Sequence, residues 1–332
     1  MSWKTIFGHE RLVTHFIDLM RNGRLGHAYL FVGPSGIGKR RFACEIARSL
    51  LCESPREVGE PCEHCPACQQ VESGTHPDLI LAARPDDKLE LPIDVIREVS
   101  RRLALKPARG GRKIAIIDDA DDLNDTAANA FLKTLEEPPP RSVLILLATD
   151  SETQLPTIVS RCQVIRFSPL PTEKVVEILQ NQGYDEAKAR RWARLSGGSP
   201  GQALALSDDR LWEFRSELAS WLQQRSGNPI TLAQNWKQFL EEAGKDAAAQ
   251  RLRAVVSLRF LMDFLNAAIH QAVGDVPEVD DPAGQQAVAA LASRWSVDRL
   301  LALVDRCLDA DMQIYRRVQL TLVIDALAVA LT

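Results

Sequence analysis

The sequence predicts an α/β domain built on a parallel sheet, followed by regions that are entirely helical. Short apolar runs alternate with amphipathic stretches over residues 1–168, as expected of helices that cover a parallel sheet. The glycine-rich stretch GPSGIGK (33–39) joins an apolar run to an amphipathic one, which is the place for a strand-to-helix turn. Beyond residue 168 we find no run with the pattern of a strand.

The individual elements of the first part follow from apolar spacing and from turn residues. HAYLFVG is a short apolar run that ends in glycine, and it predicts a buried strand. The stretch after it predicts a helix because Phe42, Ile46 and Leu50 share one face. Three prolines after TAANAFLKTLEE predict the end of another helix. In full, we expect strands at 27–33, 78–84, 112–123, 142–150 and 162–167, and helices at 40–52, 93–105 and 126–140.

The chain is long enough for two or three domains, since 332 residues exceed what one compact core holds. The strand pattern stops near SPLPTEK (168–174), and residues 172–206 have the pattern of a small helical module. From residue 209 onward the apolar spacing is helical throughout. We therefore expect an α/β domain at 1–168, a small helical domain at 169–208 and a larger helical domain at 209–332.

Composition and charge exclude several classes of protein. The chain is 45% hydrophobic and 25% charged, which is ordinary for a globular protein. Its net charge of −4 argues against nonspecific binding of nucleic acid through bulk charge. The N-terminal segment lacks an apolar signal core, and Asp325 interrupts the most apolar run, VQLTLVIDALAVALT, so we expect a buried helix there and no membrane partner. These features, with seven cysteines, predict a reducing cytoplasmic location.

The stretch GPSGIGKRRF has the pattern of a phosphate-binding loop with one defect. Gly33, Gly36 and Gly38 allow backbone N–H groups at a helix N-terminus to close around phosphate oxygens, and Lys39 adds a positive charge. The next residue is normally a Ser or Thr that binds Mg²⁺, but here it is Arg40, which offers only donors and repels a cation. We therefore expect that ATP binding can survive, whereas hydrolysis is impaired or absent. The alternative is a glycine-rich turn that binds no nucleotide.

Polar residues at two strand ends complete the candidate pocket. Asp118 follows the apolar run IAII and is placed to hold a metal through water, and Asp119 takes the position of the residue that polarises the attacking water. An Asp at the second position is one methylene shorter than the usual Glu, which displaces the base. Thr149 ends the following strand and can contact a phosphate. For Asp121 and Asp122, capping of the strand end is the competing interpretation.

Four cysteines in CESPREVGEPCEHCPAC predict a structural zinc site. Cys52, Cys62, Cys65 and Cys68 have the spacing C-x9-C-x2-C-x2-C, and four thiolates suit tetrahedral Zn²⁺ with no open position. His64 is a weak alternative ligand because its neighbour Cys65 already occupies that place. The other three cysteines, Cys44, Cys162 and Cys307, are not part of such a spacing pattern and are expected in the core.

The first 205 residues resemble bacterial clamp-loader subunits of the AAA+ class. The resemblance is carried by GRLGHAYLFVGPSGIGK, DDADDLNDTAANAFLKTLEEPP, LILLATDSETQLPTIVSRCQVIRF and LSGGSPGQALAL. It implies a phosphate-loop parallel-sheet domain with the zinc insertion at 52–68, a helical lid, and a C-terminal helical collar that joins a ring. The implied partners are tau/gamma and delta subunits in a heteropentamer, and the sliding clamp and primed DNA through that complex.

Two departures from the family pattern indicate a member that does not hydrolyse ATP. ATP-driven members carry a nucleotide-contacting Arg in the lid, where this chain has Ser199, Pro200 and Gly201. The chain also ends soon after the collar, without a polymerase-binding tail. By contrast, the segment SRC is intact, and in the family the arginine corresponding to Arg161 reaches the ATP of the neighbouring subunit. The resemblance therefore implies that Arg161 is an arginine finger, supplied in trans to the ATP site of a neighbouring subunit during clamp loading in DNA replication.

Other interpretations stay open at this point. The chain could be an active, tau/gamma-like ATPase that tolerates Arg40 and Asp119, whereas a different AAA+ machine is disfavoured by the cysteine cluster and the SRC segment. Without the family pattern, Arg161 would be taken as a surface arginine in a salt bridge. Residues 97–113 carry seven basic side chains and one acid, which suits either a solvated helix face or a patch for DNA phosphate or a neighbouring subunit.

Overall fold

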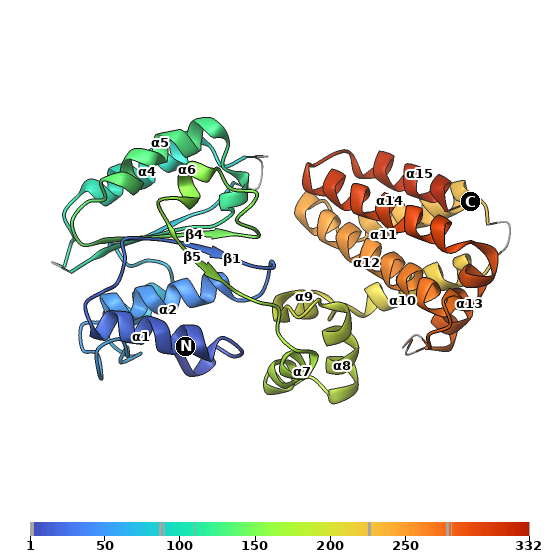
Figure 1. Cartoon of the computed structure of the whole chain (residues 1–332), viewed down its shortest axis with the longest axis horizontal. Helices are drawn as coiled ribbons and strands as arrows, with labels where there is room; N and C mark the ends of the chain where they lie inside the picture. Colours follow the sequence, from blue (N-terminus) through green and yellow to red (C-terminus); the bar gives the residue numbers. More distant parts are fainter. Residues whose placement is uncertain are drawn as a thin grey trace. The chain divides into compact units, whose positions relative to one another are not determined.

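The structure divides into two compact units, residues 1–204 and 205–332 (Figure 1). It is a computed structural model, and it describes residues 3–85, 88, 90–109, 111–224, 227–276, 279 and 281–331. The first unit contains the parallel sheet, the helices that cover it and three further helices, and the second is helical. The boundary therefore falls at the end of the small helical module, four residues before the predicted one. None of the helices in the described residues combines the length and apolar character that a membrane span requires.

The described part of the first unit contains a five-stranded parallel sheet in the order β2-β3-β4-β1-β5. Its strands are mostly continuous apolar runs, which is typical of a parallel sheet covered on both faces. The register pairs Val32 with Ala148 and Arg166, so the carboxyl ends of β1, β4 and β5 lie together at one edge. The strands are β1 (Ala28–Val32), β2 (Leu79–Ala82), β3 (Lys113–Ile117), β4 (Ser142–Ala148) and β5 (Gln163–Arg166).

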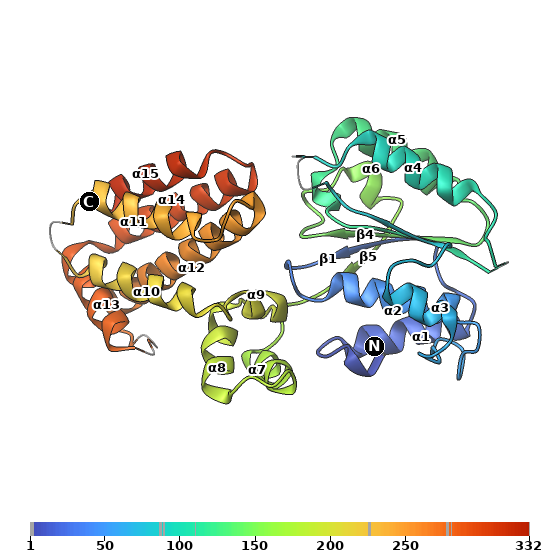
Figure 2. The same ribbon diagram turned by 180° about the vertical axis from the view of Figure 1, so that it is seen from behind.

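The two faces of the sheet bury different side chains because successive residues of a strand point to opposite sides. From β1, Leu30 and Val32 pack with residues of α4 (Ile93–Ala104) and α5 (Asp125–Glu136). Phe31 instead contacts the aromatic rings of Phe16 on α1 (Glu10–Arg21) and Phe42 on α2 (Lys39–Leu51). Figures 1 and 2 show α4, α5 and α6 (Pro156–Val159) on one face of the sheet and α1 and α2 on the other.

Most predicted elements exist, but their ends differ from the expected ones. The strand expected at 112–123 ends at Ile117, because Asp119 adopts a left-handed backbone (φ 54°) and a short 3₁₀ turn, η2 (Ala120–Asp122), follows. The helix expected at 126–140 ends at Glu136, two residues before the first of three prolines, because a residue that precedes proline disfavours helical geometry. Helices α1 and α3 (Pro66–Glu72) were not predicted.

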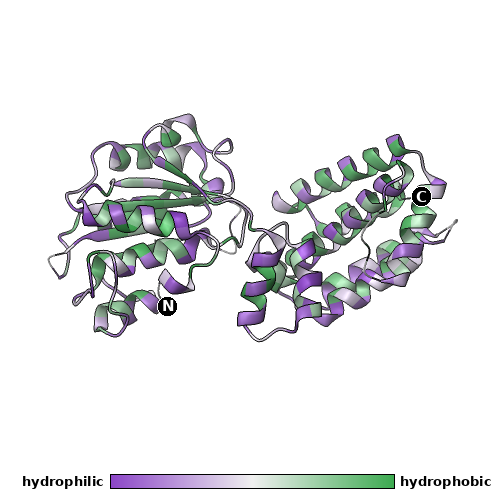
Figure 3. Cartoon of the chain, turned by 60° about the horizontal axis from the view of Figure 1, so that its bottom comes forward, coloured by the Kyte–Doolittle hydropathy of each residue, from purple (hydrophilic) through white to green (hydrophobic). Residues whose placement is uncertain are grey.

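Three helices complete the first unit: α7 (Thr172–Asn181), α8 (Glu186–Leu195) and α9 (Pro200–Ala205). They bury an apolar face formed by Val175, Leu179, Trp192 and Ala203. We refer to these helices as the lid, in keeping with the sequence prediction. Figure 3 shows that the strands of the sheet are largely hydrophobic, whereas the surrounding helices present both hydrophobic and hydrophilic sides.

The second unit packs its helices around aromatic side chains and one buried arginine. Phe214 stacks on Phe239 with ring centroids 4.1 Å apart, and Trp236 donates to the hydroxyl of Ser257. Arg215, only 1% exposed, pairs with two aspartates, which compensates the cost of burying its charge. The helices are α10 (Asp209–Leu222), α11 (Pro229–Glu241), α12 (Ala247–Ala272), α13 (Pro282–Arg294), α14 (Val297–Tyr315) and α15 (Leu320–Ala330).

Candidate functional site

The phosphate loop lies between β1 and α2, as predicted. Its last glycine, Gly38, is the N-cap of α2 with φ 108°, a conformation that a residue with a side chain rarely adopts. Lys39 begins the helix, and its Nζ donates to the carbonyl oxygens of Gly33 (2.5 Å) and Pro34 (2.9 Å). Burial lowers the pKa of Lys39, while the carboxylates of Asp121 and Asp118 oppose this shift. The loop therefore combines a lysine with a helix N-terminus, the residue types that suit a bound phosphate.

A cavity of about 340 Å³ opens above this loop. On its rim the guanidinium of Arg40 points to the carboxylate of Asp118, with 3.4 Å between Nη1 and Oδ2. Asp118 itself follows β3, and its Oδ1 accepts from the N–H of Asp119 (3.1 Å). The residue types fit a bound phosphate, but the place of the hydroxyl ligand for Mg²⁺ is taken by a fixed cation. The lining residues are Ser35, Gly36, Gly38, Lys39, Arg40, Arg41, Asp118, Asp119, Asp121, Leu147, Ala148 and Thr149.

The other acidic residues at this sheet edge, Asp119, Asp121 and Asp122, differ in their contacts. Asp119 lines the cavity, and burial, together with the charge of Asp118, raises the pKa of its carboxyl group. Asp121 holds the segment after β4, because its Oδ2 accepts from the backbone N–H of Thr149 (2.6 Å) and its Oδ1 from the side chain of Thr153 (2.8 Å). Asp122 pairs with Arg84 at 2.5 Å. Asp121 and Asp122 thus stabilise the turns, which is the capping interpretation weighed for them.

The lid contacts the phosphate loop directly. The backbone N–H of Gly201 donates to the carbonyl of Gly36 (3.0 Å), and the hydroxyl of Ser199 donates to the carbonyl of Ser35 (2.8 Å). A Cβ atom on Gly201 would lie 2.8 Å from the Cα of Gly36, so only glycine permits this approach. Within the described residues, the lid contributes no side chain to the lining of the cavity. The segment in which ATP-driven clamp loaders are expected to carry an arginine therefore binds the loop through neutral groups.

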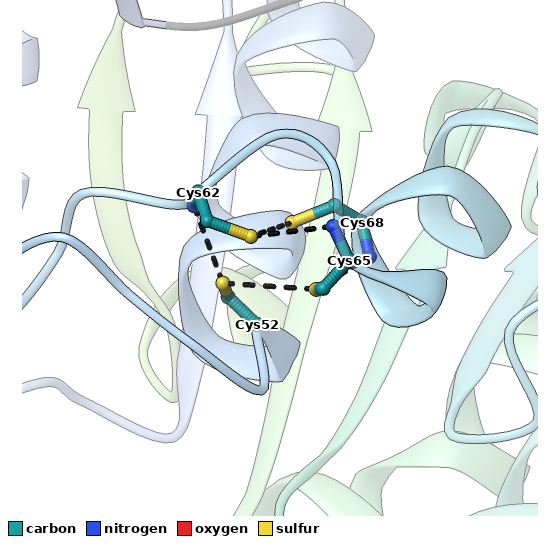
Figure 4. A group of neighbouring side chains, drawn as sticks. All are labelled: Cys52, Cys62, Cys65 and Cys68. Atoms are coloured by element: carbon teal, nitrogen blue, oxygen red, sulfur yellow. Dashed lines mark hydrogen bonds between the residues drawn. The ribbon is translucent and has the colours of Figure 1, made fainter.

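The four predicted cysteines lie together, from the end of α2 to the start of α3 (Figure 4). All four Sγ atoms lie within 4.8 Å of one another, with 3.9 Å between those of Cys52 and Cys65 and 4.0 Å between those of Cys62 and Cys68. Zn–S bonds of about 2.3 Å in a tetrahedron would put sulfurs about 3.8 Å apart. The cluster can therefore bind a metal ion such as zinc with little rearrangement.

Hydrogen bonds favour the thiolate form of Cys62, whereas burial raises the pKa of Cys52 and Cys68. Backbone N–H groups of Cys62, Cys65 and Cys68 donate to the Sγ atoms of Cys52, Cys62 and Cys65 respectively, at 3.3–3.4 Å. Burial raises the pKa of Cys62, but N–H donors of His64 and Cys65 outweigh this effect and lower it to about 6. The imidazole of His64 bonds instead to the carbonyl oxygen of Cys62 (2.8 Å). His64 is therefore outside the ligand group.

Of the three other cysteines, one is fully buried and two are partly exposed. Cys307 is buried in the second unit, which agrees with its expected place in a core. Cys162 is partly exposed but packs against the core of the sheet, and Cys44 is also partly exposed. The expectation of full burial is therefore wrong for these two.

Arg161 lies in the turn between α6 and β5, with its side chain 33% exposed. Its Nε and Nη2 donate to one carboxylate oxygen of Glu136, at 2.8 and 2.5 Å, and its Nη1 donates to the carbonyl of Thr157 at 2.9 Å. The predicted finger is thus held by its own chain, by a partner that the sequence analysis did not identify. No local pattern indicates this pair, because its members lie 25 residues apart.

Three of the seven basic side chains at 97–113 pair with acids among the described residues. Arg101 forms a two-bond pair with Glu98 (2.7 Å for each bond), Arg97 lies 3.6 Å from Asp94, and Arg109 pairs with Glu53. Lys113 is buried and donates to the carbonyl of Arg102 (2.7 Å). The contacts of Arg97 and Arg101 agree with a solvated helix face.

Comparison with known proteins places the chain among subunits of one replication enzyme. The family described as DNA polymerase III, delta subunit, matches residues 8–171. The chain is 35% identical to DNA polymerase III subunit delta' of Escherichia coli (strain K12), over 89% of this chain and 84% of that protein. It is 31% identical to subunit tau of the same organism, over 77% of this chain and 40% of tau. A DNA polymerase III gamma subunit-related protein of Thermotoga maritima is 19% identical, with TM-score 0.41 over 93% of this chain and 98% of that one.

Proposed function

Because the chain belongs to the family of DNA polymerase III delta' subunits, we propose that it serves as the delta' subunit of a clamp-loader complex and supplies Arg161 to a neighbouring ATP site. Its partners would be tau/gamma and delta subunits in a ring, with the sliding clamp and primed DNA engaged by the whole complex. The chain itself would contribute binding and positioning, and its neighbour would carry out the hydrolysis.

The observation that carries this proposal is the contrast between two arginines. Arg40 occupies the position of the Mg²⁺-binding hydroxyl in the chain's own cavity and faces Asp118. Arg161 lies at the surface, where an acceptor from outside the chain can reach it. In related NTPases, an arginine supplied in trans stabilises charge on the transferring phosphoryl group and adds about three to five decades of rate. The chain thus has a nucleotide pocket that is impaired for hydrolysis and an arginine finger that a neighbouring subunit can reach.

The chain's own residues support phosphate binding more than hydrolysis. Lys39 and the N-terminus of α2 can hold the outer phosphates of a nucleotide such as ATP. Bound Mg²⁺ normally neutralises the developing charge and bridges two phosphate groups, but Arg40 would repel it. Asp119 in turn places its carboxylate one methylene further from an attacking water than Glu would. We therefore propose that any nucleotide in this cavity is bound and not turned over.

The other predicted features have supporting roles in this proposal. We propose that Cys52, Cys62, Cys65 and Cys68 hold a structural Zn²⁺ that fixes the insertion beside α2. The helical second unit would serve as the collar. Its helix α14 carries exposed apolar residues on one side, which we call the α14 stripe and assign to a neighbouring collar. The α14 stripe consists of Leu301, Leu308, Met312 and Tyr315.

The test is the DNA-stimulated ATPase of the assembled complex with Arg161→Ala in this subunit. We expect most of the turnover at the facing site to disappear while the complex still assembles, because the guanidinium acts on the transition state. Arg166→Ala, at the end of β5 and exposed, is a matched control that should leave turnover unchanged. Unaltered turnover and clamp loading with Arg161→Ala would refute the finger.

The rival interpretation, an active tau/gamma-like ATPase, makes the opposite prediction for the isolated chain. It requires Mg²⁺-dependent ATP turnover that Lys39→Ala abolishes. If the chain binds nucleotide without hydrolysing it, wild-type and Lys39→Ala chains should give the same background ATP turnover.

A further inference from the structure

We infer that Glu136 is a positioning residue for Arg161, holding the guanidinium in the orientation in which it can meet a phosphate of the neighbouring subunit. This inference rests on the proposed function, because it has a kinetic meaning only if Arg161 acts in trans. The starting point is the geometry of the pair: one oxygen, Oε1 of Glu136, accepts from both Nε (2.8 Å) and Nη2 (2.5 Å).

The contacts of Arg161 select which edge of the guanidinium stays open. A guanidinium has five N–H groups. Four of these donations stay within the chain: two to Glu136, one to the carbonyl of Thr157 (2.9 Å) and one to the hydroxyl of Ser160 (3.2 Å). Among the described residues, the second proton of Nη2 has no acceptor. The pair therefore occupies the Nε edge and leaves one N–H of Nη2 for an acceptor outside the chain.

Both partners are attached to parts of the structure that cannot easily move. Glu136 is the last residue of α5, whose Phe131 and Leu135 are buried in the core of the sheet. Arg161 lies two residues after α6, and its backbone N–H donates to the carbonyl of Ile158, which is also buried. A long arginine side chain that is fixed at its base and at its head is preorganised, so less freedom is lost when it meets a phosphate.

Stability of the fold is a poor explanation for this pair. The side chains of Arg161 and Glu136 are 33% and 48% exposed. Ion pairs at such exposure contribute little to folding, because solvent screens them and holding the two side chains costs entropy. The pair therefore matters because it fixes the position of the Arg161 guanidinium. A shift of about 1 Å at a catalytic group can cost up to about a hundredfold in rate.

The experiment compares Glu136→Ala, Glu136→Gln and Arg161→Ala in the assembled complex. The Arg161-dependent turnover is the ATPase of the wild-type complex minus that of the Arg161→Ala complex. We expect Glu136→Ala to lower this turnover about tenfold through kcat, with KM for ATP unchanged. Glu136→Gln keeps an acceptor oxygen and should stay within about threefold of wild type. Glu137→Ala, an exposed neighbour, is the matched control and should have no effect.

A double variant separates positioning from other roles. If Glu136 acts through Arg161, then adding Glu136→Ala to Arg161→Ala should change nothing further, since residues that act as a unit are not additive. A rise in turnover with Glu136→Ala would mean that the carboxylate withholds the finger, and it would overturn the inference, as would an unchanged rate. If Arg161→Ala itself has no effect, the proposed function fails; if only Glu136→Ala has none, the positioning role alone fails.

Discussion

The guanidinium of Arg40 lies 3.4 Å from the carboxylate of Asp118, at the rim of the cavity above the phosphate loop. The two groups form an ion pair at the position where an active ATPase holds Mg²⁺ between a loop hydroxyl and an acid. This pair is exposed, so it contributes little to stability. Its effect is to weaken the binding of Mg²⁺, because the charge of Asp118 is partly compensated and the hydroxyl ligand is missing.

Replacing Arg40 should make nucleotide binding dependent on magnesium. For Arg40→Thr we expect Mg²⁺ to increase ATP affinity about tenfold, which corresponds to about 1.4 kcal/mol. For the wild type we expect no such gain. The measurement is a titration of the isolated chain with ATP in Mg²⁺ or in EDTA. Arg41→Thr is the matched control, since Arg41 also lines the cavity but does not occupy the ligand position. A Mg²⁺ requirement in the wild type would contradict the assignment.

Removal of the proposed Zn²⁺ should destabilise the first unit. Its four cysteines form a cluster with only one alanine as an apolar neighbour among its buried residues, which is too small to be stable without a metal. We expect about one Zn²⁺ per chain after purification without chelators, and a loss of at least about 2 kcal/mol in Cys65→Ser, or several degrees in Tm. Cys44→Ser should keep its zinc. Less than half an equivalent of zinc in the wild type would contradict the site.

Stability should fall in mild acid because of a buried histidine. Burial lowers the pKa of His9 below 6.5, although its bond to the Ile37 carbonyl and the charge of Glu10 oppose this. The unfolded chain then binds the proton more tightly, so stability is lost as the pH falls below 6.5 toward the folded-state pKa. We expect His9→Gln to lose less unfolding free energy than the wild type between pH 7.5 and 5. Denaturant titrations at both pH values measure this, and equal losses would exclude His9 as the cause.

Charges on the α14 stripe should weaken assembly without unfolding the chain. Leu308 and Met312 are 52% and 51% exposed, so glutamate at either position meets water in the isolated subunit. In a collar interface the same charge would be desolvated. We expect Leu308→Glu to reduce incorporation into the ring at least about tenfold, measured by size-exclusion chromatography at several concentrations. Val273→Glu, which changes an exposed residue at the end of α12, is the control. Normal incorporation of the Leu308→Glu variant would exclude the α14 stripe as an interface with a neighbouring subunit.

The elements of the fold and the cysteine ligands could be predicted because their signals are local. Continuous apolar runs identify the strands, and the spacing of Cys52, Cys62, Cys65 and Cys68 identifies the cysteine cluster. The positions of Lys39 and Asp118 followed from strand ends that meet at one sheet edge. The ends of elements were less certain, since Asp119 and the proline run alter the backbone in ways that apolar spacing does not record.

The partners of the site residues could not be predicted, because they depend on contacts between distant segments. Glu136 meets Arg161 only when α5 and the turn after α6 lie side by side, and Gly201 meets Gly36 across 165 residues of sequence. Asp121 was weighed only as a cap, and its bonds to Thr149 and Thr153 follow from the placement of β3 next to β4. Such pairs are determined by topology and not by periodicity.

At Gly201 and Gly36 the backbones of the lid and the phosphate loop are in direct contact, with no room for a side chain between them. A ligand that displaces the carbonyl of Gly36 must therefore either break its hydrogen bond with the N–H of Gly201 or move the lid with it. Ligand binding at the loop and the position of the lid therefore meet at this one backbone contact.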